Sequence, residues 1–152
     1  HLTDDNVKGF NAQAYVLPPL RSNTDQQAIR RGLKDGTIDA ICSHHEPLNS
    51  TAKKAPFAES TPGISNFDTF MALACQLVRD EVLTLEQLVD KICLNPAKIA
   101  GISEKYESIG GAVLVDPNLE WQVTTETMLS NGKNTPFFNE QLQGRVVETF
   151  FA

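Results

Sequence analysis

Short apolar runs and one capped amphipathic stretch organise the first part of the chain. Residues 14–17 and 38–42 are apolar and end at prolines or polar residues, which is typical of buried strands that run into loops. Between them, Thr24 and Gln27 form a capping box, and Gly36 suits the position just after a helix. Strand, capped helix and strand in this order predict one unit of a parallel α/β architecture.

Further helices are predicted downstream from an apolar stripe and from cap residues. The stripe follows helical spacing, which is more typical of a core than of a cofactor site. Its members are Phe67, Phe70, Met71, Ala74, Leu77 and Val78. Thr84 and Gln87 form a second capping box. Asn95 as a cap, Pro96 at a first helical position and Gly101 at the end predict a short last helix.

The pattern changes to strands after about residue 105. Three strands are predicted, over residues 112–115, 119–123 and 145–150. Turn-forming residues at 116–118 link the first two of these strands. We therefore expect an α/β part over residues 1–104 and a small β domain over residues 105–152, in which Trp121 packs in the core or between domains.

Composition and charge narrow the possible classes of function. The 152 residues carry a net charge of −6 at pH 7 without a basic cluster, which argues against nucleic acid as a partner. No apolar run approaches the roughly 20 residues of a membrane span. Cys42, Cys75 and Cys93 lie in apolar runs without paired spacing, which predicts buried, reduced thiols and a cytoplasmic location. Since the chain begins at His1 and not at a methionine, we expect a fragment of a longer protein.

Several motifs, in a fixed order, resemble the dihydroorotases of the amidohydrolase superfamily. In the first half they are VLPPLRS at 16–22, DGTIDAICSHHEP at 35–47, PF at 56–57 and TPGI at 61–64. In the second half they are NPA at 95–97, NTPF at 134–137 and GRVV at 144–147. The resemblance implies an α/β fold, namely the C-terminal part of a metal-dependent (β/α)8 TIM barrel plus part of a small composite β-sandwich. A complete barrel needs roughly 250 residues, so this chain does not close one alone.

Three positions depart from the active members of this family. Active dihydroorotases end the last barrel strand with Asp-His-Ala-Pro-His, and the resemblance implies that this Asp contacts zinc and takes a proton from the attacking water. Here His44 replaces the Asp, and Leu48 replaces the second His, which helps to hold the substrate. Leu17 replaces an Asn that binds the dihydropyrimidine ring. Because imidazole brings no negative charge and leucine makes no hydrogen bond, we expect no catalytic residues here.

A remodelled metal site at His44 and His45, which Glu46 follows, is the alternative for this strand end. Adjacent strand residues point to opposite sides, so the two histidines are not expected to bind one ion. We expect no cofactor, with zinc implied only for an active hydrolase, and a structural role for His45. Pro62 and Gly63 match a loop whose backbone contacts substrate in active relatives, and here they are expected to remain as scaffold. Arg21 is expected to form a structural ion pair, with anion binding as the alternative.

The resemblance allows three interpretations of function. The first is a non-catalytic dihydroorotase homologue of pyrimidine biosynthesis, which forms a hetero-oligomer with aspartate carbamoyltransferase and supports its assembly or activity. The second is an active zinc-dependent dihydroorotase, or a related cyclic-amide hydrolase of the allantoinase or hydantoinase type. Upstream metal ligands in the full gene would discriminate between these two. The third, a free-standing binding module, is disfavoured because barrel edges would be exposed.

A surface loop at residues 49–60 is the expected contact region in the first interpretation. Lys53 and Lys54 would supply charge there, and Phe57 would supply an apolar anchor. The alternative is that the loop is mobile and only solvated.

Overall fold

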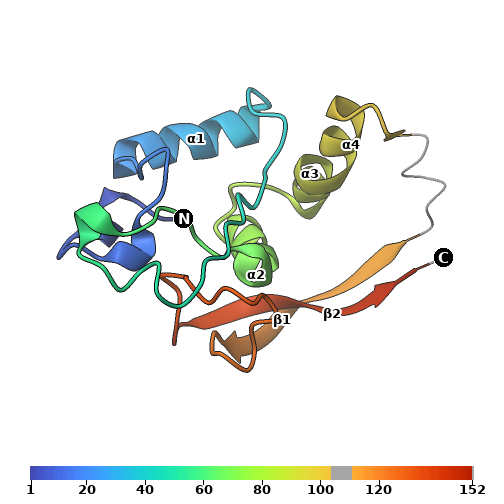
Figure 1. Ribbon diagram of the computed structural model, residues 1–152. Coiled ribbons are helices and arrows are strands. Elements are labelled where there is room, and N and C mark those ends of the chain that lie inside the picture. The colour runs from blue at the N-terminus through green and yellow to red at the C-terminus, as the bar shows by residue number, and fades with distance from the viewer. Residues whose placement is uncertain (104–110, 152) are drawn as a thin grey trace. The chain divides into compact units, whose positions relative to one another are not determined.

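The structure, a computed structural model, describes residues 1–103 and 111–151 (Figure 1). Its contacts divide the chain into two compact units, each assembled from three segments. We call the first the loop unit; it comprises His1–Ile29, Ser43–Phe70 and Gln122–Leu142. The second, the helical unit, comprises Arg30–Cys42, Met71–Trp121 and Gln143–Ala152. The boundary predicted between residues 104 and 105 falls outside the described residues and stays a prediction.

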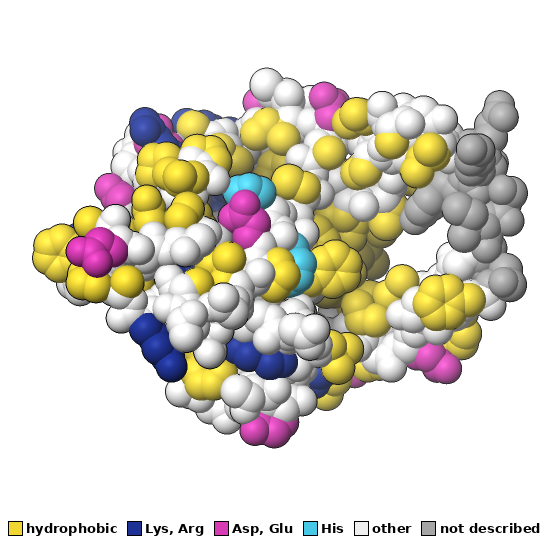
Figure 2. All heavy atoms as spheres, in the orientation of Figure 1, with side chains coloured by type: hydrophobic (Ala, Val, Ile, Leu, Met, Phe, Trp, Pro, Cys, Tyr) yellow, Lys and Arg dark blue, Asp and Glu magenta, His cyan; other side chains and the backbone are white. Residues whose placement is uncertain are grey.

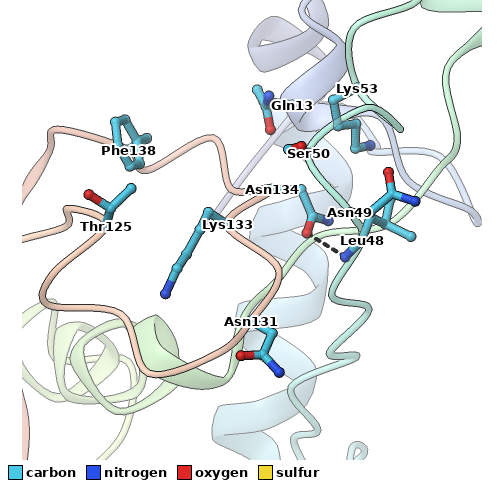
Figure 3. A pocket seen from close by; sticks show the side chains of 10 residues that line it. All are labelled: Gln13, Leu48, Asn49, Ser50, Lys53, Thr125, Asn131, Lys133, Asn134 and Phe138. Atoms are coloured by element: carbon cyan, nitrogen blue, oxygen red, sulfur yellow. Dashed lines mark hydrogen bonds between the residues drawn. The ribbon is translucent and has the colours of Figure 1, made fainter.

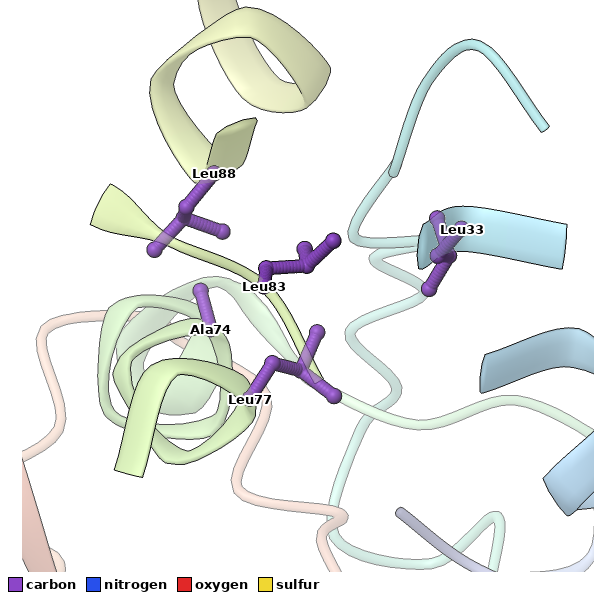
Figure 4. Packing of buried hydrophobic residues seen from close by; sticks show 5 residues of the cluster. All are labelled: Leu33, Ala74, Leu77, Leu83 and Leu88. Atoms are coloured by element: carbon purple, nitrogen blue, oxygen red, sulfur yellow. The ribbon is translucent and has the colours of Figure 1, made fainter. Parts of the chain in front are cut away.

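A buried leucine cluster forms the core of the helical unit (Figure 4). Leu33 comes from helix α1 (Asn23–Asp35), Ala74 and Leu77 come from α2 (Phe67–Arg79), and Leu88 comes from α3 (Leu85–Val89). Leu83 joins them from the connection between α2 and α3. The predicted stripe is therefore confirmed in its middle, where burying each leucine contributes roughly 1.5–3 kcal/mol.

The start of α1 differs from the predicted capping box. The Ser22 hydroxyl donates to Asp25 Oδ2 at 2.8 Å, and the Asp25 N–H donates back to Ser22 Oγ at 3.3 Å. These bonds from Ser22 hold the pKa of the Asp25 carboxyl below its usual value. A charged carboxylate caps a helix start better than an amide does, so this pair begins the helix in place of Thr24 and Gln27.

The second capping box is confirmed, whereas the last helix is only partly as predicted. Thr84 Oγ1 accepts the N–H of Gln87 at 3.2 Å, and Gln87 Oε1 accepts the N–H of Thr84 at 2.9 Å. From α3 the chain continues through a π-helical turn, η4 (Asp90–Leu94), into α4 (Asn95–Ile99). Asn95 is therefore no cap, because the helix arrives already formed and its side chain donates to Asp39 O at 3.0 Å.

Gly101 ends α4 as the sequence predicts. It has a φ of +67°, a left-handed conformation that costs glycine least. The N–H of Gly101 bonds to Lys98 O and the N–H of Ile102 bonds to Ala97 O, which is the Schellman pattern.

The strands predicted at residues 14–17 and 38–42 are not formed. The first stretch begins inside a short 3-10 helix, η2 (Ala12–Ala14), and the second has no strand ladder. Its backbone is held instead by Lys91, whose ammonium donates to Ile38 O and whose carbonyl accepts the N–H of Ile41. A strand needs neighbouring strands, and the described residues supply one parallel bridge outside the named strands, between His45 and Ile64.

Two long strands, β1 (Ala112–Gln122) and β2 (Gln141–Phe150), pair in one sheet. The turn predicted at residues 116–118 is wrong, because β1 runs through it without a break. Asp116 Oδ1 accepts the N–H groups of Asn118 and Leu119, which is the hydrogen bonding typical of a turn, but here it occurs within the strand. Trp121 is buried as expected, and its Nε1 donates to Gly144 O at 3.1 Å.

Surface features agree with the charge pattern of the sequence. On the face drawn in Figure 2, lysine and arginine side chains form small separate groups. In the described parts of the chain, no helix has both the length and the apolar character to cross a bilayer.

Cys75 is buried and Cys93 is half-buried, but Cys42 is exposed, so the prediction of a buried thiol is wrong for Cys42.

Candidate functional site

The candidate site lies at residues 43–48, the segment that resembles the catalytic strand end of dihydroorotases. The segment belongs to the loop unit. The Glu46 N–H donates to Ile64 O at 2.8 Å, beside the parallel bridge from His45 to Ile64. These contacts fix the backbone, and the chemistry then depends on which side chains remain available.

His44 is exposed and has a positive φ of 45°. Its Nε2 lies 3.8 Å from Glu46 Oε1, and both side chains are about half exposed. The sequence shows that the carboxylate is lost at position 44 and that Glu46 follows two residues later, and the structure adds that this carboxylate lies beside the imidazole.

His45 has the structural role expected of it. Its Nδ1 accepts the N–H of Asn66 at 3.1 Å and the N–H of Phe67 at 3.0 Å, at the start of α2. The first N–H groups of a helix have no partners inside the helix, so His45 acts as their cap. With Nδ1 accepting, the proton of a neutral ring sits on Nε2. Neither nitrogen then has a lone pair to offer a metal.

The described residues of this chain do not by themselves bring together the donors of a zinc centre. Among the described residues, no three His, Cys, Asp or Glu side chains gather closely enough to hold an ion. His44 and Glu46 are two donors on a half-exposed surface, and His45 is engaged in capping α2. Structural zinc needs four ligands and catalytic zinc normally takes three from the protein.

Of the other predicted site positions, only Leu48 lies in the segment at residues 43–48. Leu17 is 53% exposed. Leu48 does lie in that segment, where its N–H donates to Asn134 Oδ1 at 2.7 Å. The Gly63 N–H donates to Tyr15 O at 3.0 Å, so this donor is already used within the chain.

Asn134 is the residue that ties these segments together. It is 5% exposed, and its Nδ2 donates to Glu46 O at 2.9 Å and to Gly63 O at 3.1 Å. With the bond to Leu48, one side chain serves three backbone groups, and we call this arrangement the Asn134 junction. The sequence marked Asn134 only as part of a resembling motif; nothing local in it revealed these partners.

A cavity of about 380 Å³ lies beside the Asn134 junction, within the loop unit (Figure 3). It is lined by Gln13, Leu48, Asn49, Ser50, Lys53, Thr125, Asn131, Lys133, Asn134 and Phe138. Among the described residues that line it, the ionisable ones are the two lysines. The cavity therefore has a positive potential and a mixed polar and apolar wall.

The loop at residues 49–60 is held by contacts with Tyr15. Lys53 is only 9% exposed, and its ammonium donates to Tyr15 O at 3.0 Å, so the prediction that it supplies surface charge is wrong. Phe57 packs against Tyr15 with ring centroids 4.8 Å apart. Lys54 is exposed, as expected. Arg21 forms the expected ion pair, with its Nε 3.3 Å from Asp25 Oδ2.

Comparison with known proteins gives a consistent relationship. No protein-family profile matches the sequence. The dihydroorotase of Syntrophus aciditrophicus (strain SB) is 44% identical over 151 residues, which are 97% of this chain and 35% of that protein. The dihydroorotase of Geobacter metallireducens is 40% identical over 97% of this chain and 36% of that protein. The chain thus spans about a third of the length of these curated relatives.

Solved structures give the same fold. The L-hydantoinase (dihydropyrimidinase) of Arthrobacter aurescens superposes with a TM-score of 0.87 at 24% identity, over 99% of this chain and 35% of that one. The dihydropyrimidinase of Brevibacillus agri superposes with a TM-score of 0.81 at 26% identity, over 91% of this chain and 32% of that one. The chain is therefore dihydroorotase-like in sequence, with the fold of hydantoinase-type amidohydrolases over about a third of their length.

Proposed function

We propose that this chain is the C-terminal part of a dihydroorotase-like protein of pyrimidine biosynthesis that does not catalyse the reaction and acts as a scaffold. In this proposal the full natural polypeptide assembles with aspartate carbamoyltransferase and supports that enzyme's oligomer or activity. The similarity to dihydroorotases supports the pathway, and the loss of chemistry at the strand end supports the scaffold role.

The observation that carries the proposal is the state of the strand end. An exposed imidazole stands at position 44, and His45 uses Nδ1 to cap α2. A base that removes a proton from water between two metal ions must also tolerate their charge, which a carboxylate does and an imidazole does not. Leu48 and Leu17 add no polar side chain that would hold a ring substrate.

Activity of the full natural polypeptide tests the catalytic half of the proposal. We expect no cyclisation of carbamoyl aspartate and no opening of dihydroorotate above background after loading with zinc. Loss of a general base alone lowers the rate roughly a hundred- to ten-thousand-fold. The dihydroorotase of Syntrophus aciditrophicus, assayed in parallel, is the positive control. Turnover within tenfold of that control would overturn the proposal.

Restoring the aspartate at position 44 alone tests whether the missing base or the missing substrate contacts account for inactivity. His44→Asp alone should leave the protein inactive, because Leu17 and Leu48 still make no hydrogen bond to a substrate. Activity near that of the control enzyme from this single change would show that the rest of the pocket is intact.

An active cyclic-amide hydrolase is the second candidate, and one observation favours it. Glu46 brings a carboxylate to within 3.8 Å of His44 Nε2, so a base could be supplied from two residues away. If this candidate is right, the natural protein turns over a cyclic amide and Glu46→Gln abolishes that turnover. Equal low rates in both proteins would leave the scaffold proposal standing.

Association with aspartate carbamoyltransferase tests the scaffold half. Co-expressed proteins should elute together in size-exclusion chromatography at micromolar concentration. Separate elution, with the carbamoyltransferase fully assembled and active alone, would contradict this half without affecting the catalytic half.

A further inference from the structure

Asn131 and Gly132 form an Asn–Gly pair in a loop that belongs to the loop unit. Asn131 is exposed, and in Figure 3 its side chain projects from the loop without a dashed line to another labelled residue. Among the described residues, its side-chain amide has no hydrogen-bond partner. The Cγ atom of Asn131 is therefore open to solvent, and no bonded neighbour holds the amide in place.

Gly132 places a backbone nitrogen next to this amide. Within the described part of the chain, its N–H group has no acceptor. Glycine also lacks a Cβ, so the residue itself does not hinder the approach of its nitrogen to the preceding side chain. Attack by this nitrogen on Asn131 Cγ would therefore break no hydrogen bond inside the protein.

Two other asparagines of the loop unit show the contrast. Asn49 Oδ1 accepts the N–H groups of Thr51 at 3.0 Å and Ala52 at 3.1 Å, and its next residue carries a Cβ. Asn134 is buried and uses its amide for the three bonds of the Asn134 junction. Both side chains are held away from the nitrogen that follows them, whereas that of Asn131 is not.

We propose that Asn131 is a site of spontaneous deamidation, which produces an isoaspartyl linkage in this loop. The Gly132 nitrogen, after losing its proton to hydroxide, bonds to Asn131 Cγ. The bond from Cγ to Nδ2 then breaks, and Nδ2 leaves as ammonia with a proton from water. Water opens the resulting succinimide ring at either carbonyl carbon. One opening gives an ordinary aspartate, and the other gives a backbone that runs through the former side chain.

The isoaspartyl linkage has a structural consequence because the loop is fixed on both sides. Before it, Asp68 Oδ1 accepts the N–H of Leu129 at 2.7 Å, and after it Asn134 is bound in its junction. The linkage adds one backbone atom between these anchors. Space is short there, since a Cβ on Gly132 would already lie 2.5 Å from Leu48 N. Modification should therefore weaken the junction, whether or not the protein is a scaffold.

Ageing of the full natural polypeptide at mildly alkaline pH tests the reactivity of Asn131. Peptide mass mapping follows each asparagine, because replacing a side-chain amide by a carboxyl group raises the mass of the peptide. We expect Asn131 to convert at least about tenfold faster than Asn49, whose amide is bonded and whose next residue has a Cβ. The rate should rise with pH, since the attacking nitrogen is deprotonated. Conversion no faster than at Asn49 would overturn the proposal.

The same incubation in concentrated urea shows whether the folded loop permits the reaction. Unfolding removes the anchors at Asp68 and Asn134, so the unfolded rate is that of a free Asn–Gly pair. We expect the folded rate to lie within about a hundredfold of it, because the loop has to adjust but no hydrogen bond of the reacting groups has to break. Stronger protection would mean that the reaction requires unfolding, and it would overturn the proposal.

Two variants separate the linkage from the added charge. Asn131→Gln lengthens the side chain and disfavours ring closure, so its peptide should keep its mass during ageing. Freshly prepared Asn131→Asp is the matched control, since it carries the new charge on an ordinary backbone. The aged natural protein, purified by ion exchange, should be labelled by isoaspartyl methyltransferase and should unfold at lower urea than Asn131→Asp. Absence of labelling would overturn the proposal, and equal urea midpoints would overturn the effect on the junction.

Discussion

The leucine cluster of the helical unit and the Asn134 junction of the loop unit stabilise the chain through different kinds of interaction. The cluster buries apolar side chains, such as Leu77 and Leu88, whose contribution scales with area and depends little on direction. The junction has one buried amide that joins Leu48, Glu46 and Gly63 through three directional bonds. The first tolerates small shifts, whereas the second fails when one partner is lost, because buried polar groups then remain unpaired.

This difference bears on the proposed scaffold function. The junction fixes the backbone of the strand-end segment, while the side chains at His44 and Leu48 make none of its bonds. Chemistry can therefore be lost at that segment without unfolding it. The proposed scaffold function needs only the shape that such a junction maintains.

Asn134→Ala should give the largest effect on stability. The N–H of Leu48 and the carbonyls of Glu46 and Gly63 would lose their partner, at about 1–3 kcal/mol each, so we expect about 4 kcal/mol less stability. Urea unfolding of the full natural polypeptide measures it. Asn131→Ala, an exposed amide of the same loop, is the control and should stay within about 0.5 kcal/mol. A loss below 1 kcal/mol at position 134 would mean that water replaces the amide.

Gly132 adds a steric requirement to the same junction. A Cβ at this position would lie 2.5 Å from Leu48 N and 2.7 Å from Pro47 Cα. Both are backbone neighbours that cannot move aside cheaply. Gly132→Ala should therefore cost about 3 kcal/mol by overpacking. Gly9→Ala, where no atom lies within 4 Å, is the control for added bulk, although its own positive φ costs about 1 kcal/mol.

Leu88→Ala tests the apolar side of the comparison. Leu88 is 2% exposed in the cluster, so truncation should cost about 3 kcal/mol through lost burial and the cavity left behind. Leu85→Ala, on the same helix but 62% exposed, should cost less than about 0.5 kcal/mol. Equal effects in denaturant melts would show that the cluster is not the core of its unit.

The contrast also explains how far the sequence predicts the molecule. Ala74, Leu77 and Leu88 follow helical spacing, so their burial can be read from a local pattern. The partners of Asn134 lie 71 to 88 residues away along the chain, and no local pattern encodes such pairs.

Lys53 and residues 38–42 show a different kind of error, in which a local pattern gives a wrong prediction. Lys53 lies among polar residues and was expected at the surface. Its side chain is instead buried, and its ammonium donates a hydrogen bond to Tyr15 O. Residues 38–42 have the composition of a strand, yet strand pairing depends on neighbours, and their backbone bonds go to Gly32, Lys91 and Asn95. At the candidate site, the missing carboxylate at position 44 and the neighbouring Glu46 were both visible in the sequence, and only the 3.8 Å between His44 Nε2 and Glu46 Oε1 needed the structure.

Substitution of Asp68 should give the smallest effect on stability, and this effect should depend on pH. Burial pushes the pKa of Asp68 upward, but hydrogen bonds from the Ser130 hydroxyl and from the N–H groups of Leu129 and Ser130 outweigh burial, so the pKa lies below its usual value. A carboxyl whose pKa is lower in the folded state stabilises the fold above its unfolded pKa. That contribution is lost as the pH falls through the folded pKa, because the protonated group accepts these bonds poorly.

We therefore expect unfolding free energy to fall by about 1 kcal/mol more in the natural protein than in Asp68→Asn between pH 6 and pH 3, after allowing for the partial exposure of this carboxyl. Urea melts at several pH values measure the difference. Asp5→Asn is the control, since Asp5 is exposed and its ion pair with Lys8 lies at the surface. If Asp68→Asn loses stability with acid as steeply as the natural protein does, the bonds to Leu129 and Ser130 do not distinguish the charged form, and this contact is only a geometric anchor.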